Sequence, residues 1–401
     1  MTERNILNEI GGQGLDQLEL EQLIFNYYSH GSAQGPDLVS YGRTQGEDAV
    51  RISYSKRGKL QAISPGPNWQ ESDLEVLHLR IAEELRRDHG QGVNRKILFC
   101  AVPVIGTFRY KDVFQILPCP PDAPMPGHPT GDHPFVLEIA FSKSSSASIN
   151  SLRYGRAARN LELLCVILLP WISSGISNRV IKRWVVLHDE PTRSSKNIYT
   201  QEGYWITLPG PTNAFSDVSN LPALNRHPDN DYYGFRGIAG NEVLDLPEQF
   251  ENRLDAYFSL TEEDRDTFQC AAYWFNHARR AQETSQSAEF LALINGLEAL
   301  LPQASAHAEC STCRKRLGPS ISDKFVELIE KYAPSPNVSV QDKKGLYGLR
   351  SAVAHGGKLL YDDVSGGRGG LSGLQMRHQT SSRNIRHIAR IVMLNWLISR
   401  H

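Results

Sequence analysis

The feature that most limits the fold is a change of apolar spacing near residue 246. From Leu246 onward, apolar residues recur at helical spacing and the segments open with helix-capping residues. We expect helices over 261–282 and 287–301, from Ser320, through 350–355 to the pair Gly356-Gly357, and from Ser382 onward. Residues 246–401 are therefore predicted to form an all-α domain.

The first 245 residues alternate between helix and strand patterns. We expect helices over 15–30, 72–88 and 151–169, strands over 96–103, 107–117, 135–141, 183–188 and 204–208, and a proline-rich loop over 118–134. A stretch rich in Pro, Gly, Asn and Asp, 211–240, precedes the change of pattern. The predicted fold class is α+β, with a mixed α/β domain over 1–245 followed by the all-α domain.

Composition indicates an ordinary globular protein. Of 401 residues, 40% are hydrophobic and 22% charged, and six cysteines are too few for a disulfide framework. The longest apolar run, 163–172, contains Pro170 and is too short to span a bilayer. The start is polar and of mixed charge, unlike a secretory signal. We therefore expect a cytoplasmic protein without a membrane partner.

Positive charge gathers at the C-terminal end. Residues 341–401 contain ten Lys or Arg and three Asp, a net charge of +7 within a chain whose net charge is −1. In the last helix a basic stripe is formed by Arg383, Arg386, His387 and Arg390. One interpretation is a surface that binds RNA; the other is the solvated side of a packing helix whose apolar stripe includes Ile385 and Trp396.

A short motif places two chemically useful side chains close together. Leu349–Gly357 contains Arg350 and, five positions later, His355. Arginine holds phosphate through paired hydrogen bonds, and histidine exchanges protons near neutral pH. These residue types suffice to cut RNA without a metal, with the 2′-hydroxyl as nucleophile. The sequence contains no phosphate-binding glycine loop with its lysine and no His-Glu-x2-His metalloprotease motif.

This motif resembles that of the HEPN superfamily, and most closely its ApeA-like group in bacterial defence proteins. The likeness covers roughly the last 150 residues and is carried by the helix 290–301, by Tyr347-Gly348-Leu349 before the motif and by Gly356 after it. It implies an all-α HEPN bundle that dimerises and sets two Arg-His motifs into one cleft. Many members are metal-independent endoribonucleases, whereas others only bind.

The resemblance also suggests roles for individual residues. His355 would be the general acid and base, Arg350 would stabilise the phosphate, and Ser351 and Glu298 would support them. Ser351 stands where many active relatives carry Asn, Asp or His. Glu298 matches an acidic position on the facing helix; the alternative is that it holds the bundle together through a structural ion pair with Arg350.

Helix geometry bears on the expected assembly. Five residues correspond to about 140° around a regular helix, so Arg350 and His355 would not point the same way from one copy. Two helices meeting across a dyad would present two copies of each side chain to one groove. We therefore expect a homodimer or a higher even-numbered oligomer.

Two thiols and one imidazole lie close together in sequence. His307, Cys310 and Cys313 supply three ligands of the kind that zinc prefers, but a structural zinc site needs four. The hypotheses are a structural zinc completed by a distant ligand, or ordinary thiols on a loop. No cofactor is expected for catalysis.

Three functions remain open from the sequence. The first is a metal-independent endoribonuclease, in anti-phage defence or as a toxin, restrained or triggered through residues 1–245 by a phage-derived or protein signal. The second is a non-catalytic module that binds RNA, a nucleotide or a protein partner. The third is an antitoxin-like or scaffold role in which the basic helix contacts an acidic partner.

Overall fold

The protein is described by a computed structural model, which divides into two compact units. The first unit comprises Met1–Asn94, Ile139–Ala157 and Gly210–Phe215, and the second comprises Arg95–Glu138, Ala158–Pro209 and Ser216–His401. The structure describes residues 4–56, 58–86, 89–100, 102–121, 123, 133–168, 183–188, 197–202, 210–234, 243–282, 284–302, 319–334, 338–365 and 372–401. The second unit therefore includes much of the chain before residue 246, the position at which the sequence predicts a domain boundary.

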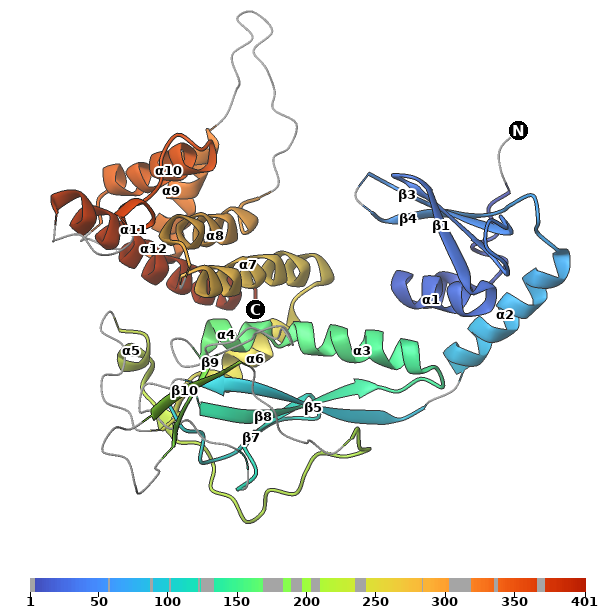
Figure 1. Ribbon diagram of the computed structural model, residues 1–401, viewed down its shortest axis with the longest axis horizontal. Helices are drawn as coiled ribbons and strands as arrows, with labels where there is room; N and C mark the ends of the chain where they lie inside the picture. Colours follow the sequence, from blue (N-terminus) through green and yellow to red (C-terminus); the bar gives the residue numbers. More distant parts are fainter. Residues whose placement is uncertain are drawn as a thin grey trace, which may run out of the picture. The chain divides into compact units, whose positions relative to one another are not determined.

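A four-stranded antiparallel sheet forms one layer of the first unit (Figure 1). Its strands, in spatial order, are β1 (His30–Gly35), β2 (Leu38–Gly42), β3 (Val50–Tyr54) and β4 (Leu60–Pro65). This sheet was not predicted from the sequence. Its first strand reads His-Gly-Ser-Ala-Gln-Gly and is exposed throughout, so it carries none of the alternating apolar pattern that identifies a half-buried strand.

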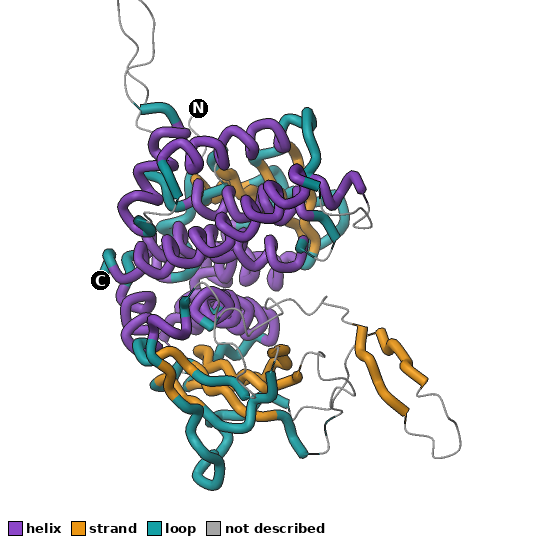
Figure 2. The backbone as a smooth tube through the Cα atoms, turned by 90° about the vertical axis from the view of Figure 1, so that its left-hand side faces the viewer, coloured by secondary structure: helices purple, strands orange, loops and turns teal. Residues whose placement is uncertain are grey.

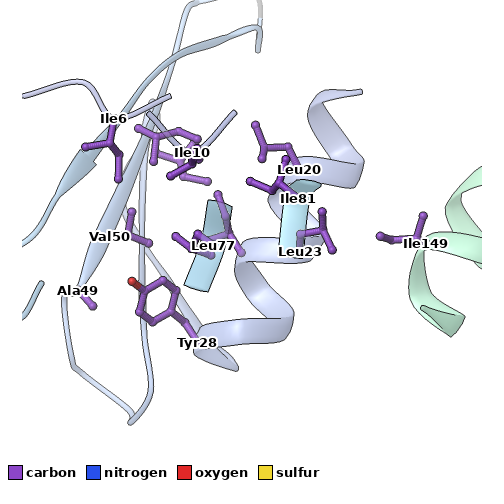
Figure 3. Packing of buried hydrophobic residues seen from close by; sticks show 13 residues of the cluster. Ile6, Ile10, Leu20, Leu23, Tyr28, Ala49, Val50, Leu77, Ile81 and Ile149 are labelled. Atoms are coloured by element: carbon purple, nitrogen blue, oxygen red, sulfur yellow. The ribbon is translucent and has the colours of Figure 1, made fainter. Parts of the chain in front are cut away.

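Two helices complete the core of the first unit. Helix α1 (Gln17–Tyr28) and helix α2 (Glu71–Arg86) pack on each other, and their buried apolar side chains meet those of the sheet (Figure 3). Both lie close to the predicted ranges. Helix α2 begins one residue before the predicted range, and the Asp73 carboxylate accepts the hydrogen bond from Gln70 N.

The second sheet has the spatial order β5-β8-β7-β6. Its strands are β5 (Gln91–Cys100), β6 (Phe108–Tyr110), β7 (Phe114–Pro118) and β8 (His133–Ser142). The three strands predicted in this region are confirmed as members of one sheet, although 107–117 forms two short antiparallel strands instead of one. Most of the predicted proline-rich loop lies outside the described residues.

The segment after β8 is helical but interrupted. The helix predicted over 151–169 is observed as α3 (Ala147–Asn160) and α4 (Glu162–Ile167), with a break at Leu161. The predicted strand at 183–188 is confirmed as β9 (Arg183–His188), which pairs with β10 (Asn197–Glu202). The strand predicted at 204–208 lies outside the described residues.

A short region connects these elements to the helical half. It contains the single parallel pair of two-residue strands β11 (Arg226–His227) and β12 (Leu246–Pro247) among the described residues, and a four-residue helix, α5 (Asp229–Tyr232). Tyr232 and Tyr233 at the end of α5 are buried. This region therefore contributes to the core of the second unit although its sequence reads as a loop.

The rest of the described chain is helical, as predicted (Figure 2). The helices are α6 (Phe250–Ser259), α7 (Glu262–Ala281), α8 (Gln286–Ala299), α9 (Ile321–Tyr332), α10 (Val340–Ala354), α11 (Tyr361–Ser365) and α12 (Gly373–Ile398). Helix α8 contacts α7, α10, α11 and α12, which makes it the centre of the bundle. The predicted caps at Thr261 and Ser320 are confirmed, because their hydroxyls accept hydrogen bonds from Asp264 N and Asp323 N.

The last helix is longer than predicted. Helix α12 starts at Gly373, with Ser372 accepting from Gln375 N, whereas the prediction placed the start near Ser382. Leu374 and Met376 are exposed, so the first turns lack the apolar stripe that marks the rest. None of the helices found among the described residues has both the length and the apolar content needed to cross a membrane.

Candidate functional site

The motif lies on α10, which is fixed against α8 and α9. A capping box between Ser339 and Asp342 starts the helix, and Leu346 and Val353 are buried on its inner side. Lys343 is also buried, and its ammonium group meets Glu330 of α9 at 2.6 Å. Neighbouring helices therefore set the orientation of α10 before the motif begins.

One carboxylate joins three residues at the centre of the site. Oε1 of Glu298 accepts from the Tyr347 hydroxyl and Oε2 accepts from Arg350 Nη2, each at 2.8 Å. Arg350 also lies over the Tyr347 ring, with its guanidinium carbon 5.9 Å from the ring centroid. The predicted proximity of Glu298 and Arg350 is thus observed, and Tyr347 is a third member whose role the sequence analysis did not identify.

Partial burial makes these contacts stronger than surface ion pairs. The side chains of Arg350 and Glu298 are 25% and 21% exposed. Burial, followed by the hydrogen bond to Glu298 and its charge, raises the pKa of Tyr347 to about 12, so its hydroxyl remains a donor near neutral pH. Arg350 Nε is buried and has no hydrogen-bond partner among the described residues. The hydrogen bond from Nη2 to Glu298 therefore orients the guanidinium group, and Nε remains available to donate to another acceptor.

The end of α10 places His355 at the helix terminus. Its backbone NH donates to Ser351 O at 3.2 Å, and Gly356 follows in the left-handed conformation with a φ of 71°. Gly357 N donates to Ala352 O and Gly356 N donates to Val353 O, the paired bonds of a Schellman motif. The predicted helix stop at Gly356-Gly357 is confirmed, and it leaves the His355 side chain exposed.

Arg350 and His355 are not joined within one chain. The described residues provide no hydrogen bond or ion pair between the His355 imidazole and either Arg350 or Glu298. The side chain of Ser351 is half-buried and likewise forms no hydrogen bond with them. The site thus contains an organised half, around Glu298, and an exposed half, at His355.

The segment after the motif is attached to α8. The Asp363 carboxylate accepts from Gln286 N at 2.9 Å, from Ser287 N at 2.8 Å and from the Ser285 hydroxyl at 3.0 Å. Burial opposes its ionisation, but these hydrogen bonds outweigh burial, so the pKa of Asp363 lies below its usual value. Leu360 N also donates to the Ser287 hydroxyl at 2.8 Å. The chain leaving His355 is therefore fixed within a few residues.

A buried histidine supports the same segment. His378 of α12 is 3% exposed, and its Nδ1 accepts from Tyr361 N at 3.0 Å. Burial lowers the pKa of His378, and the nearby cations Lys358 and Arg377 act in the same direction. An accepting Nδ1 requires the neutral ring, so both observations agree. This role of His378 was not predicted, because a single histidine in a helix carries no distinctive pattern.

The predicted RNA-binding stripe on α12 divides into residues with different environments. Arg383 is exposed, whereas Arg386 Nε donates to Glu289 of α8 at 2.8 Å. Glu289 is buried, and that burial raises its pKa despite the opposing effect of Arg386. Burial, then the charge of Arg390, lowers the pKa of His387. RNA binding by the stripe stays a prediction, and Arg386 has an intramolecular partner.

Arg390 faces the interior of the second unit. Its Nη2 donates to Tyr233 O at 3.3 Å and lies 3.4 Å from His387 Nδ1. Its guanidinium carbon is 5.9 Å from the centroid of the Tyr233 ring. Unlike Arg386, it has no ion pair with a carboxylate in the described part of the chain.

The three predicted zinc ligands, His307, Cys310 and Cys313, lie outside the described residues. Within the described ranges no group of three or more His, Cys, Asp or Glu side chains is arranged to hold a metal ion. The zinc hypothesis therefore stays a prediction.

Comparisons with known proteins found no related protein. No family model, no curated protein and no solved structure matches the chain. The resemblance to HEPN proteins therefore stays a prediction from the residues of the motif and its surroundings.

Proposed function

We propose that the protein is a metal-independent endoribonuclease of the HEPN type, whose active site combines Arg350 and His355. The observation that supports this most is the Glu298–Arg350 pair, which orients a guanidinium group and leaves its Nε unpartnered. An oriented cation with a remaining donor suits the binding of a phosphate in a fixed position.

His355 is suited to proton transfer because it is exposed at a rigid helix end. In the proposed reaction the RNA 2′-hydroxyl loses its proton and its oxygen attacks the adjacent phosphorus. The bond from phosphorus to the 5′-oxygen breaks, and that oxygen takes up a proton as it leaves. The products are a 2′,3′-cyclic phosphate and a 5′-hydroxyl. Histidine serves as base, acid or both in such proton transfers.

Two copies are part of the proposal. The exposed position of His355 and the inward position of Arg350 leave one chain with the two groups unconnected. A homodimer, or a higher even-numbered oligomer, would bring Arg350 of one copy and His355 of the other to the same phosphate. An equal mixture of inactive Arg350→Ala and His355→Ala proteins should then recover part of the activity.

The test is cleavage of total RNA and tRNA by the full chain in excess chelator. Wild type is compared with Arg350→Ala, His355→Ala and Arg377→Ala, the last removing an exposed cation of α12. Cleavage should persist in chelator, survive in Arg377→Ala and fall by about 10²–10⁴-fold in His355→Ala. Thermal melts show whether each variant is folded. Cleavage that needs a divalent metal would contradict the proposal.

One observation favours a second function, a non-catalytic module that binds RNA, a nucleotide or a protein. Glu298 already neutralises Arg350, as expected if that pair stabilises the bundle. Under this alternative, RNA binds without being cut and His355→Ala binds it equally well. The two proposals are separated by measuring binding and cleavage on the same preparation.

The biological setting is proposed from the resemblance alone. A nuclease of this kind would act in the cytoplasm, in anti-phage defence or as a toxin, and the first unit would receive a phage-derived or protein trigger. Expression of wild type and His355→Ala in cells, with and without phage, tests this. Toxicity or protection that does not depend on His355 would argue against it.

A further inference from the structure

Glu298 meets Arg350 through only one of the two nitrogens with which an arginine commonly holds a carboxylate. Oε2 of Glu298 accepts from Arg350 Nη2, and Oε1 accepts from the Tyr347 hydroxyl, each at 2.8 Å. Arg350 Nε, which points to the same side of the guanidinium group as Nη2, has no hydrogen-bond partner among the described residues. The carboxylate is thus divided between a tyrosine and one nitrogen of the arginine.

Other arginines of the chain meet a carboxylate through both of these nitrogens. Arg386 Nε and Nη2 lie 2.8 Å and 2.5 Å from Oε1 of Glu289 in the same helical bundle. Arg4 binds Glu9 as a fork, with Nε 3.2 Å from Oε1 and Nη2 2.6 Å from Oε2. The planar guanidinium group favours such contacts because two hydrogen bonds form side by side. The contact made by Arg350 departs from this arrangement.

Tyr347 is fixed in the position that divides the carboxylate. Its ring packs against the ring of Phe325, a fully buried residue of α9, at a centroid distance of 5.2 Å. The guanidinium carbon of Arg350 lies 5.9 Å from the centroid of the same ring. Burial, followed by the hydrogen bond to Glu298, raises the pKa of Tyr347 to about 12. The hydroxyl therefore stays protonated near neutral pH and keeps donating to Glu298 Oε1.

Loss of the Tyr347 hydroxyl would leave an acceptor and a donor unpaired on the same side of the arginine. Oε1 of Glu298 would lack its donor, while Arg350 Nε already lacks an acceptor. Rotation of the carboxylate satisfies both groups by closing a two-bond fork, and buried polar groups are normally paired in this way. A phosphate would then have to displace two charge-assisted hydrogen bonds instead of one.

We propose that Tyr347 is a positioning residue that keeps Arg350 available to RNA by preventing Glu298 from closing a two-bond fork on it. The effect is indirect, because Tyr347 acts on the guanidinium group through the shared carboxylate. The inference rests on the proposed ribonuclease function for its effect on RNA. The state of the Glu298–Arg350 pair, however, can be measured without RNA.

The direct test is the NMR signal of the Arg350 Nε–H group in the ¹⁵N-arginine-labelled full chain, assigned with Arg350→Lys. In wild type its proton should resonate upfield of the carboxylate-bound Nε–H of Arg386. In Tyr347→Phe it should move downfield toward the Arg386 signal, because it gains a carboxylate acceptor. Phenylalanine retains the aromatic ring, so the effect of the ring on the signal is preserved. Tyr273→Phe, which removes an exposed hydroxyl from α7, should leave the signal unchanged.

RNA cleavage adds a double-mutant cycle. Tyr347→Phe should lower cleavage about tenfold or more, since RNA has to displace one further charge-assisted hydrogen bond. In a Glu298→Gln background the same substitution should change cleavage by less than about twofold, because the neutral amide holds the guanidinium group only weakly. Tyr273→Phe is again the control and should cleave like wild type. Thermal melts show whether each variant is folded.

Either measurement can overturn the proposal. An Arg350 Nε–H signal that Tyr347→Phe leaves in place means that the fork does not close, and a wild-type signal already at the Arg386 position means that it is closed from the start. Equal fold losses of cleavage with and without Glu298 mean that Tyr347 acts independently of the carboxylate. If wild type cuts no RNA, the ribonuclease proposal fails, and the Nε–H signal alone decides whether Tyr347 controls the pair.

Discussion

Arg153 in the first unit and Arg390 in the second unit are both partly buried, yet their charges are balanced differently. Arg153 Nη2 lies 2.7 Å from Glu19 and 3.0 Å from Glu84, whose side chains are nearly fully buried. Arg390 meets a carbonyl oxygen, an imidazole and an aromatic ring. Two carboxylates therefore balance the charge of Arg153, whereas Arg390 has no carboxylate partner among the described residues. Arg350, with one carboxylate and one free donor, is intermediate.

The largest expected effect is the loss of the complete arrangement. Arg153→Met leaves Glu19 and Glu84 as buried carboxylates with too little positive charge and should destabilise the first unit by about 3–5 kcal/mol. Urea unfolding of the full chain, followed by circular dichroism, measures this. Arg156→Met, at an exposed position, is the control and should cost less than about 1 kcal/mol. Equal effects of the two would remove the contrast.

Disruption of the Glu298–Arg350 pair, the intermediate case, should lower the free energy of unfolding by an intermediate amount. Glu298→Gln leaves the partly buried Arg350 without its counter-ion and should lower the free energy of unfolding by about 1–3 kcal/mol. Tyr347→Phe removes one hydrogen bond to the same carboxylate and should cost about 1 kcal/mol. Chemical denaturation of both variants tests the order. A stable Glu298→Gln would show that the pair contributes little to the bundle.

Acid should weaken the segment after the motif. The pKa of His378 is lower in the folded protein than its usual 6.5, so the unfolded chain binds the proton first. Stability from this residue is complete above pH 6.5 and is lost as pH falls through 6.5 toward the lower folded pKa. His378→Gln should reduce the slope of stability against pH in that window. Because the pKa of His387 is also lowered, part of the slope should remain.

The smallest effect should have the opposite sign. In phosphate-free buffer, Arg390→Gln removes a buried cation without a carboxylate partner and should stabilise the protein by up to about 1 kcal/mol. A thermal melt of wild type and Arg390→Gln measures the gain. Destabilisation in phosphate-free buffer, as with Arg153→Met, would mean that Arg390 is a structural residue.

Local signals in the sequence predicted the helical half well. Thr261 and Ser320 cap their helices because short-range hydrogen bonds decide such starts, and Gly356 ends α10 because glycine takes a positive φ at little cost. The start of α12 was missed because its exposed first turns carry no apolar stripe. Helix caps and glycine helix stops depend on a few neighbouring residues and can be predicted from a single sequence.

Contacts between distant segments could not be predicted in the same way. In the sequence, Tyr347 was noted only as one residue of the motif. Its hydrogen bond to Glu298 joins residues 49 positions apart in the chain. Arg390 was assigned to a surface stripe, yet it turns toward Tyr233, which is 157 residues away in the chain. Helix periodicity gives the direction of a side chain on its own helix, but the partner that it meets depends on the packing of the other elements.

Analysis of the ends of the cut RNA tests the central claim most directly. A defined RNA is incubated with the full chain in excess chelator, and the product ends are identified by mass spectrometry for wild type and for folded His355→Ala. The proposed nuclease predicts 2′,3′-cyclic phosphate and 5′-hydroxyl ends for wild type and at least about 10²-fold less product for the variant. Ends bearing 5′-phosphate, or cyclic-phosphate products that His355→Ala forms equally well, would contradict it.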